Sequence, residues 1–211
     1  IPDPKSNTTL TVSVENITYD ENATVRVTLK DANGNNITGV TVNVTIGGKP
    51  YVITVTDGVG LRNITGLGAN DNYVVNATFN GTDAYYPSNA TANFTVYKAN
   101  STLTINDNVT FDYNTNGSTT VSYTNATGVN ASVVGQPNAI VVVNDTTITV
   151  SGLNAGNYTL TVTTITDANH NNITRNATIT VNKLKTELTA SAVTTTYNIN
   201  KDLVITLKDS T

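Results

Sequence analysis

The segment Val40-Thr41-Val42-Asn43-Val44-Thr45-Ile46 alternates apolar and polar side chains and ends at the pair Gly47-Gly48. Because successive side chains of a β-strand point to opposite faces, this alternation predicts a strand with one buried face. Glycine pairs are turn signals, since glycine readily adopts the positive φ angles of tight hairpins. The segment therefore predicts a half-buried strand followed by a turn.

The sequence repeats itself, which divides the chain into units. Three residues near the start are matched without a gap at an offset of 178: Leu10, Tyr19 and Leu29 by Leu188, Tyr197 and Leu207. At an offset of 85, Val96-Tyr97-Lys98 is matched by Val181-Asn182-Lys183. Self-similarity of this kind is the signature of a repeat array. We expect complete units at 1–98 and 99–184, and the first two strands of a third, incomplete unit at 185–211.

The period-two alternation recurs throughout both units, and no stretch has a helical pattern. The residues expected to face the interior are Val25, Val27 and Leu29; Val75, Ala77 and Phe79; Ala92, Phe94 and Val96; Val129, Ala131 and Val133; Ile140 and Val142; Ile148 and Val150; Tyr158, Leu160 and Val162; and Ala177, Ile179 and Val181. Tight turns are expected at Asn33-Gly34, Asp57-Gly58, Asn80-Gly81 and Asn116-Gly117. About seven short strands in a unit of this size predict an all-β fold of tandem immunoglobulin-like sandwiches.

Composition excludes several classes of function. The chain has no cysteine, which rules out disulfides, thiolate zinc sites and a thiol nucleophile. Its net charge is −4 and it has no cluster of Lys or Arg, so we expect no nucleic-acid partner. No apolar run approaches the roughly 20 residues of a membrane span, so we expect no membrane insertion. The first residues do not resemble a signal peptide, and we interpret the sequence as an internal or mature portion.

A local signal in both units sharpens the fold prediction. Gly66-Leu67-Gly68-Ala69-Asn70-Asp71-Asn72-Tyr73 and Gly152-Leu153-Asn154-Ala155-Gly156-Asn157-Tyr158 each place a Leu, a polar turn and then a Tyr that opens a strand. A sandwich places its tyrosine corner at such a position. These turns, the loop Gly81-Thr82-Asp83-Ala84-Tyr85-Tyr86-Pro87 and the Val-x-Lys unit ending resemble the Ig-like repeats of methanogen adhesin-like surface proteins and related bacterial Ig-like domains. The resemblance covers nearly the whole chain.

This resemblance implies extracellular display in a tandem stalk with a role in attachment, and it supplies no ligand-binding or catalytic residue. We therefore interpret the chain as a non-enzymatic, cell-surface stalk or filament segment whose partners are neighbouring repeats or other copies of itself. One alternative is a carbohydrate- or host-binding adhesin domain that contacts surface glycans. A second alternative is an accessory domain of a secreted hydrolase, although no catalytic carboxylate pair is evident.

The chain is rich in Asn-x-Ser/Thr triplets, the acceptor sites for N-glycosylation, with about nineteen in total. Part of this excess follows from strand geometry, because residues i and i+2 share one face and Thr is common at outward positions. We nevertheless expect several triplets to carry covalent N-glycans, and the candidates are Asn16, Asn43, Asn76, Asn93, Asn108, Asn125 and Asn176.

Two turns share the Asp-x-Asn-x-Asn spacing that opens a calcium loop, beginning at Asp31 and at Asp167. The twelfth positions are Val42 and Thr178, where such a loop needs a bidentate Glu. We therefore expect hairpin turns rather than calcium sites, and no cofactor. His170, the one histidine, lies in the second turn, and we expect it to be solvated rather than catalytic.

Two further features leave alternatives open. Tyr85 and Tyr86 form a loop pair that could stack on a sugar ring, although a hydrophobic plug at the end of the sandwich is the simpler interpretation. The last segment should form strands at 186–193 and 201–208, with Leu203, Ile205 and Leu207 in one apolar row. Two strands alone are marginally stable in water. Either the rest of a third unit of the same chain or strands from another molecule would cover this row.

Overall fold

The computed structural model describes residues 4–209, in which strands and turns alternate and no residue is helical. The chain divides into two compact units. In its described part, unit 1 comprises 4–100 and Thr166–Asn171, and unit 2 comprises Ser101–Ile165 and 172–209. Each is described below by itself.

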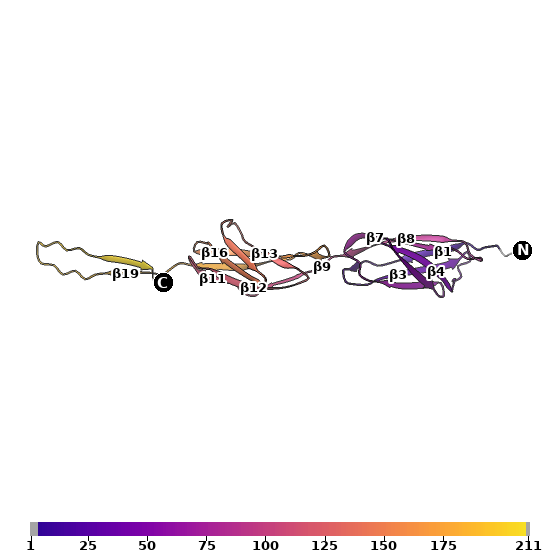
Figure 1. Ribbon diagram of the computed structural model, residues 1–211, viewed down its shortest axis with the longest axis horizontal. Coiled ribbons are helices and arrows are strands. Elements are labelled where there is room, and N and C mark those ends of the chain that lie inside the picture. The colour runs from indigo at the N-terminus through magenta and orange to yellow at the C-terminus, as the bar shows by residue number, and fades with distance from the viewer. Residues whose placement is uncertain (1–3, 210–211) are drawn as a thin grey trace. The chain divides into compact units, whose positions relative to one another are not determined.

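Unit 1 packs two sheets face to face (Figure 1). One sheet has three strands in the order β1-β3-β6, and the other has five in the order β2-β8-β7-β4-β5. The strand β2 runs parallel to β8, and all other pairs within these sheets are antiparallel. The strands are β1 (Thr8–Ser13), β2 (Ile17–Thr18), β3 (Ala23–Asp31), β4 (Val40–Ile46), β5 (Lys49–Val55), β6 (Val59–Ile64), β7 (Asn70–Phe79), β8 (Ser88–Tyr97), β9 (Ala99–Asn100) and β17 (His170–Asn171).

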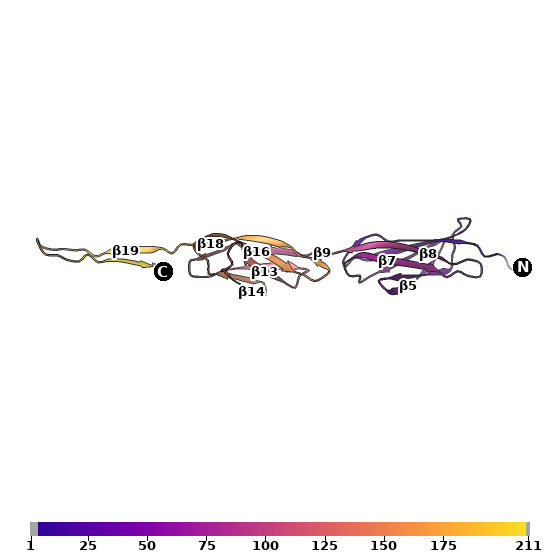
Figure 2. The ribbon, with the colours of Figure 1, turned by 90° about the horizontal axis from the view of Figure 1, so that it is seen from above.

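The sandwich of unit 2 is built from two four-stranded sheets, with orders β10-β12-β15-β14 and β11-β18-β16-β13 (Figure 2). The strand β11 pairs in parallel with β18, as β2 does with β8 in unit 1. Both units are therefore immunoglobulin-like sandwiches, and the predicted fold class is confirmed. The strands are β10 (Thr102–Ile105), β11 (Val109–Asp112), β12 (Gly117–Thr124), β13 (Gly128–Val133), β14 (Ile140–Asn144), β15 (Thr147–Ser151), β16 (Gly156–Ile165) and β18 (Thr174–Asn182).

The core of each unit consists of the alternating apolar residues. In unit 1, Val42, Val44 and Ile46 of β4 are buried, while Asn43 and Thr45 between them and Thr41 before them are exposed. In unit 2, the inward residues Leu160 and Val162 of β16 are fully buried. The alternation in these strands therefore predicts the correct face.

The interior face predicted for β14 is wrong. Ile140 and Val142 are 58% and 53% exposed, whereas Val141 is half-buried. The run Ile140–Val143 is apolar throughout, so alternation cannot choose a face. Pairing chooses it instead: Val141 lies opposite the buried Val150, and directly opposed residues of an antiparallel pair point to the same side.

The glycine of one predicted turn, Asn116-Gly117, has a different role from the one expected. Gly117 does not lie in a tight turn but is the buried first residue of β12, and the preceding turn places Asn114 at φ 64°. A Cβ on Gly117 would lie 2.5 Å from Phe111 Cδ1 and 2.6 Å from Val109 Cγ1. Glycine is needed here for close packing, not for a positive φ.

Both units contain the predicted tyrosine corner. The Tyr73 hydroxyl donates to the Gly68 carbonyl at 3.2 Å, and the Tyr158 hydroxyl donates to the Asn154 carbonyl at 2.9 Å. The two corners differ by one residue, because a register irregularity between Asn70 and Tyr73 inserts an extra residue into unit 1.

The last segment forms an antiparallel hairpin of β19 (Thr186–Ala190) and β20 (Ile205–Asp209). These strands are shorter at the turn end than expected. Their register, with Thr186 opposite Asp209, reproduces that of β1 and β3, where Thr8 lies opposite Asp31. The side chains of the predicted apolar row are exposed: Leu203 56%, Ile205 60% and Leu207 66%.

The register of β4 leads to a stability prediction. Replacing Val42 with Asp should unfold unit 1, because an unpaired carboxylate in the core costs on the order of several kcal/mol against a marginal total. Replacing its exposed neighbour Thr41 with Asp should change stability by less than about 0.5 kcal/mol. Circular dichroism during thermal unfolding measures both, and equal sensitivity of the two variants would contradict the register.

Candidate functional site

A loop that lies in sequence between β16 and β18 belongs structurally to unit 1. This 166–171 loop contains β17, which pairs in parallel with β9, so that His170 lies opposite Ala99. The Ala99 N–H donates to the Asn169 carbonyl at 3.0 Å, and the Asn171 side chain donates to that of Asn100 at 3.0 Å. Unit 1 is therefore discontinuous in sequence, and its β9 has a partner that comes from far along the chain.

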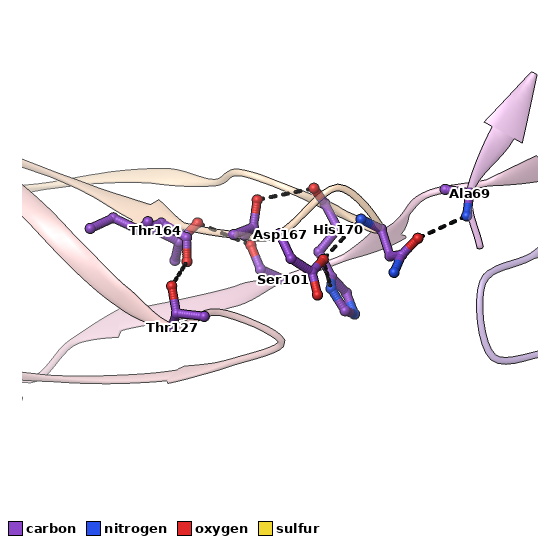
Figure 3. A network of polar contacts seen from close by, with 9 residues as sticks. Ala69, Ser101, Thr127, Thr164, Asp167 and His170 are labelled. Carbon is purple, nitrogen blue, oxygen red and sulfur yellow. Dashed lines mark hydrogen bonds and ion pairs between the residues drawn. The ribbon is translucent and has the colours of Figure 1, made fainter. Parts of the chain in front are cut away.

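Side-chain contacts also hold the 166–171 loop against the rest of unit 1. Figure 3 shows the Ala69 N–H donating to the Asn169 side-chain oxygen, at 2.9 Å. At Gly68, an added Cβ would lie 3.2 Å from this oxygen, so the small residue permits the close approach. The rings of His170 and Tyr19 meet edge to face, with centroids 5.2 Å apart and planes at 81°. These contacts make the loop part of the unit 1 structure.

The loop is shaped by Asp167, whose carboxylate points toward His170 in Figure 3. Its Oδ1 accepts the Asn169 N–H at 2.8 Å and contacts His170 Nδ1 at 2.7 Å. The hydrogen bond from His170 and that from the Asn169 backbone lower the pKa of Asp167 below 3.8. The His170 side chain is only 11% exposed, so the expectation that it is solvated is wrong. Its bond to Asp167 and its contact with Tyr19 give it a structural role.

A second polar cluster, also drawn in Figure 3, lies inside unit 2. The hydroxyls of Ser101 and Thr164, both buried, are 3.1 Å apart, and the Thr164 hydroxyl accepts the Ile173 N–H at 2.9 Å. The Thr127 hydroxyl donates to the Ile165 carbonyl at 3.2 Å. These contacts satisfy buried polar groups next to the β16–β18 connection.

Unit 1 has a loop of the same construction at residues 82–86. The Ala84 N–H donates to the Thr82 hydroxyl at 3.2 Å, as the Asn169 N–H does to Asp167. The Ser6 N–H donates to the Ala84 carbonyl and the Tyr86 N–H to the Ser6 carbonyl, both at 2.9 Å. The Ser6 backbone thus binds the 82–86 loop in the same way that the Ala99 backbone binds the 166–171 loop.

The two tyrosines of this loop have different environments. Tyr85 is half-buried and packs against the unit 1 core, whereas Tyr86 is 49% exposed. Only Tyr86 therefore presents a large part of its ring to solvent.

All seven candidate glycosylation residues are exposed. Asn43, Asn76 and Asn93 lie on β4, β7 and β8, and Asn176 lies on β18. Asn125 occupies a turn with φ 55°.

Asn16 and Asn108 also have structural roles that sequence reasoning did not identify. The Asn16 side-chain oxygen accepts the Thr95 N–H at 2.7 Å, and that of Asn108 accepts the Thr178 N–H at 2.9 Å. Each lies just before the short strand that crosses to the other sheet. Each thereby binds the start of this short strand to the strand beside it, β8 for Asn16 and β18 for Asn108.

Hydrogen bonds to the Asp31 carboxylate shape the turn that follows it. Its Oδ1 accepts the N–H groups of Asn33 and Asn35 at 2.9 Å each, and its Oδ2 accepts the Asn35 side-chain N–H at 3.0 Å. These bonds, led by that from the Asn35 side chain, lower the pKa of Asp31. Among residues 4–209, no three His, Asp or Glu side chains come together as a metal site. Within the same residues, no helix has the length and apolarity to cross a membrane.

Comparisons with known proteins identify no family. No protein-family model and no curated protein matches the sequence. Among solved structures, the titin Z1Z2 domains in complex with telethonin have a TM-score of 0.48 at 12% identity, covering 86% of this chain and 100% of that one. The Escherichia coli adhesin FdeC has a TM-score of 0.35 at 18% identity, covering 100% of this chain and 76% of that one.

The fibronectin(III)-like modules of Clostridium thermocellum CbhA have a TM-score of 0.34 at 16% identity, covering 83% of this chain and 95% of that one. The similar structures are thus immunoglobulin-like and fibronectin-like domains, a bacterial adhesin among them.

The Asn169 contact can be tested by amide hydrogen exchange. In the full chain, Asn169→Ala removes the acceptor of the Ala69 N–H, and a net hydrogen bond of about 1 kcal/mol corresponds to roughly fivefold faster exchange at Ala69. Asn169→Asp keeps an oxygen acceptor and should preserve the protection. Equal exchange in wild type and Asn169→Ala would contradict the role of this contact.

The Asp167 carboxylate predicts a pH dependence. Because its folded pKa is lowered, the contribution of the carboxylate to loop stability is complete above pH 3.8 and is lost as the pH falls through the lowered pKa. His170→Ala removes the largest cause, so Asp167 should then titrate at a higher pH. Carbon-13 NMR of the Asp167 carboxyl measures the midpoint, with Asp31 as the unchanged control. An Asp167 midpoint that His170→Ala does not move would refute this assignment.

Proposed function

We propose that this chain is a non-enzymatic extracellular module, a segment of a glycosylated stalk or filament of a cell-surface adhesin-like protein. The observation that carries the proposal is the repetition of one sandwich whose outward faces bear Asn and Thr. Such surfaces suit a spacer, since each unit presents polar side chains on the outward faces of its strands. The one histidine is engaged in the 166–171 loop, which supports a structural role over a catalytic one.

The domain organisation proposed with this function follows the repeat. Two complete sandwiches span 1–98 and 99–184, and 185–211 begins another unit. The register of β19 and β20 supports this division because it copies the register of β1 and β3.

The five-stranded sheet of unit 1 is the best candidate for a glycosylated face. Asn76 lies opposite Thr45 and Thr91, each of which is the third residue of another triplet. Neighbouring strands are about 4.8 Å apart, so triplets on adjacent strands lie side by side. Glycans on Asn43, Asn76 and Asn93 would cover this face and hinder pairing of the sheet with other chains.

The origin and location of the parent protein are part of the same proposal. The turn and loop motifs that resemble methanogen adhesin-like repeats favour an archaeal cell surface. Labelling with an antibody against unit 1, viewed by electron microscopy of intact cells, should decorate surface structures. Labelling confined to the cell interior would refute the proposed location.

Mass spectrometry tests the glycosylation. Peptides from the native source that contain Asn43, Asn76 or Asn93 should carry discrete hexose-type mass increments, because these residues point to solvent. The same peptides from the chain expressed without a glycosylation pathway are the control. Unmodified peptides at all seven candidates in the native material would remove glycosylation from the proposal.

A further inference from the structure

Unit 1 has a hollow of about 600 Å³, whose lining includes Asn70, Asp71, Tyr97, Lys98 and Asn171. We call it the Tyr97 hollow. All of its lining residues belong to unit 1, and they come from the start of β7, the end of β8 and the 166–171 loop. Its volume lies within the range of small-ligand sites in proteins, roughly 300–1,000 Å³.

A β-bulge in β7 shapes one wall of the Tyr97 hollow. Between the opposed pairs Asn70–Val96 and Tyr73–Phe94, two residues of β7 face a single residue of β8. Such a bulge interrupts the ladder and turns side chains in new directions, which is why bulges are common beside binding sites. Asp71 is one of the two bulged residues, and it lines the hollow.

Unit 2 differs from unit 1 at both of these places. Its β16 pairs with β18 without a bulge, and one residue, Asn157, stands where unit 1 has Asp71 and Asn72. By the offset of 85, Asn182 occupies the position of Tyr97. The sandwich fold therefore requires neither the carboxylate nor the aromatic ring of the Tyr97 hollow.

Tyr97 is exposed and yet held in place. It is 54% exposed, and its backbone pairs with Thr18 of β2. The Asn16 side-chain N–H donates to the Tyr97 hydroxyl at 3.2 Å, while the Asn16 side-chain oxygen accepts the Thr95 N–H at 2.7 Å. A ring held in this way loses little conformational freedom when a ligand stacks on it, and such preorganisation favours binding.

The two charged residues of the Tyr97 hollow are open to a ligand. Both Asp71 and Lys98 are exposed, and within residues 4–209 neither side chain forms an ion pair. An ionised carboxylate only accepts hydrogen bonds, and an ammonium only donates them. Since the hollow carries one charge of each sign, it favours a ligand that is neutral and offers both donors and acceptors.

We propose that the Tyr97 hollow binds a neutral hexopyranose. The apolar C–H face of the sugar ring stacks on the Tyr97 ring, because an aromatic face is a large and rigid apolar surface. The sugar hydroxyls donate to the Asp71 carboxylate, and the Lys98 ammonium donates to a hydroxyl oxygen.

Other ligand classes fit the Tyr97 hollow less well. A phosphate or carboxylate ligand is held by a surplus of positive charge, which Asp71 cancels here. A wholly apolar ligand would remove water from Asp71 and Lys98 without replacing its hydrogen bonds. A sugar avoids both costs, since it has an apolar face and an edge of hydroxyls. The site goes beyond the proposed stalk function and depends neither on glycosylation nor on where the chain resides.

NMR of the full chain tests the site. The methyl glycosides of glucose, galactose, mannose and N-acetylglucosamine are titrated separately into the nitrogen-15-labelled protein. With at least one of them, the amide signals of Asn70, Asp71 and Lys98 should shift and saturate with one common dissociation constant. The proposal is overturned if none of these glycosides shifts the three signals.

Substitutions separate the ring from the carboxylate. Tyr97→Asn introduces the residue that unit 2 has at this position, and it should weaken binding by about tenfold or more because the stacking surface is lost. Tyr97→Phe keeps the ring and should retain most of the affinity. Asp71→Asn keeps the size of the side chain but removes the charged acceptor, and it should weaken binding by about tenfold.

Tyr86→Asn is the matched control, because it removes another exposed tyrosine of unit 1 that lies outside the Tyr97 hollow. It should leave the affinity unchanged. Equal affinity in wild type and Tyr97→Asn overturns the proposal, as does a loss of binding in Tyr86→Asn alone. The dispersion of the amide signals shows whether each variant is folded. If Tyr97→Asn unfolds unit 1, the exposed substitution Asp71→Asn decides, and unchanged affinity in that variant overturns the proposal. The stalk function would survive such a result, since its tests by labelling and mass spectrometry do not involve the hollow.

Discussion

Burial of alternating apolar side chains between two sheets is the interaction on which both units depend. The chain has no disulfide to restrict its unfolded state, and domains of about 90 residues bury a smaller fraction of their surface than larger domains do. Stability must therefore come from side chains such as Val42 and Leu160, which are fully buried. Small losses of packing should be felt, because the total stability of such domains is marginal.

Polar side chains form hydrogen bonds to the backbone at the strand ends, where apolar burial does not fix the chain. The amide oxygens of Asn16 and Asn108 bind the last strand of their units where the first strand crosses between sheets. The hydroxyls of Tyr73 and Tyr158 bind the turns that lead into β7 and β16. Arg62 covers part of the edge strand β5. Its guanidinium donates to the Val52 carbonyl at 2.9 Å and lies over the Tyr51 ring. An occupied carbonyl and a nearby charge make this edge a poorer template for other strands.

Local hydrogen bonds shape the 166–171 loop and set its contacts within unit 1. Asp167 shapes the turn, the turn presents Asn169 and His170, and these bind the backbone of Ala69 and the ring of Tyr19. The 82–86 loop contains the same kind of turn, in which the Thr82 hydroxyl accepts the Ala84 N–H. This turn therefore recurs in the chain together with the sandwich fold.

The sequence by itself determined the fold class, the two sandwiches and the interior face of most strands, because period-two alternation and turn residues are local properties of the chain. It also determined the tyrosine corners, whose neighbours recur in both units. Tertiary structure alone decided which face of β14 is buried, because its residues are all apolar and only the pairing of Val141 with Val150 selects a face. It also decided the packing role of Gly117 against Phe111. It likewise decided that His170 lies against Tyr19, since ring contacts between residues so distant in sequence depend on how the whole chain folds.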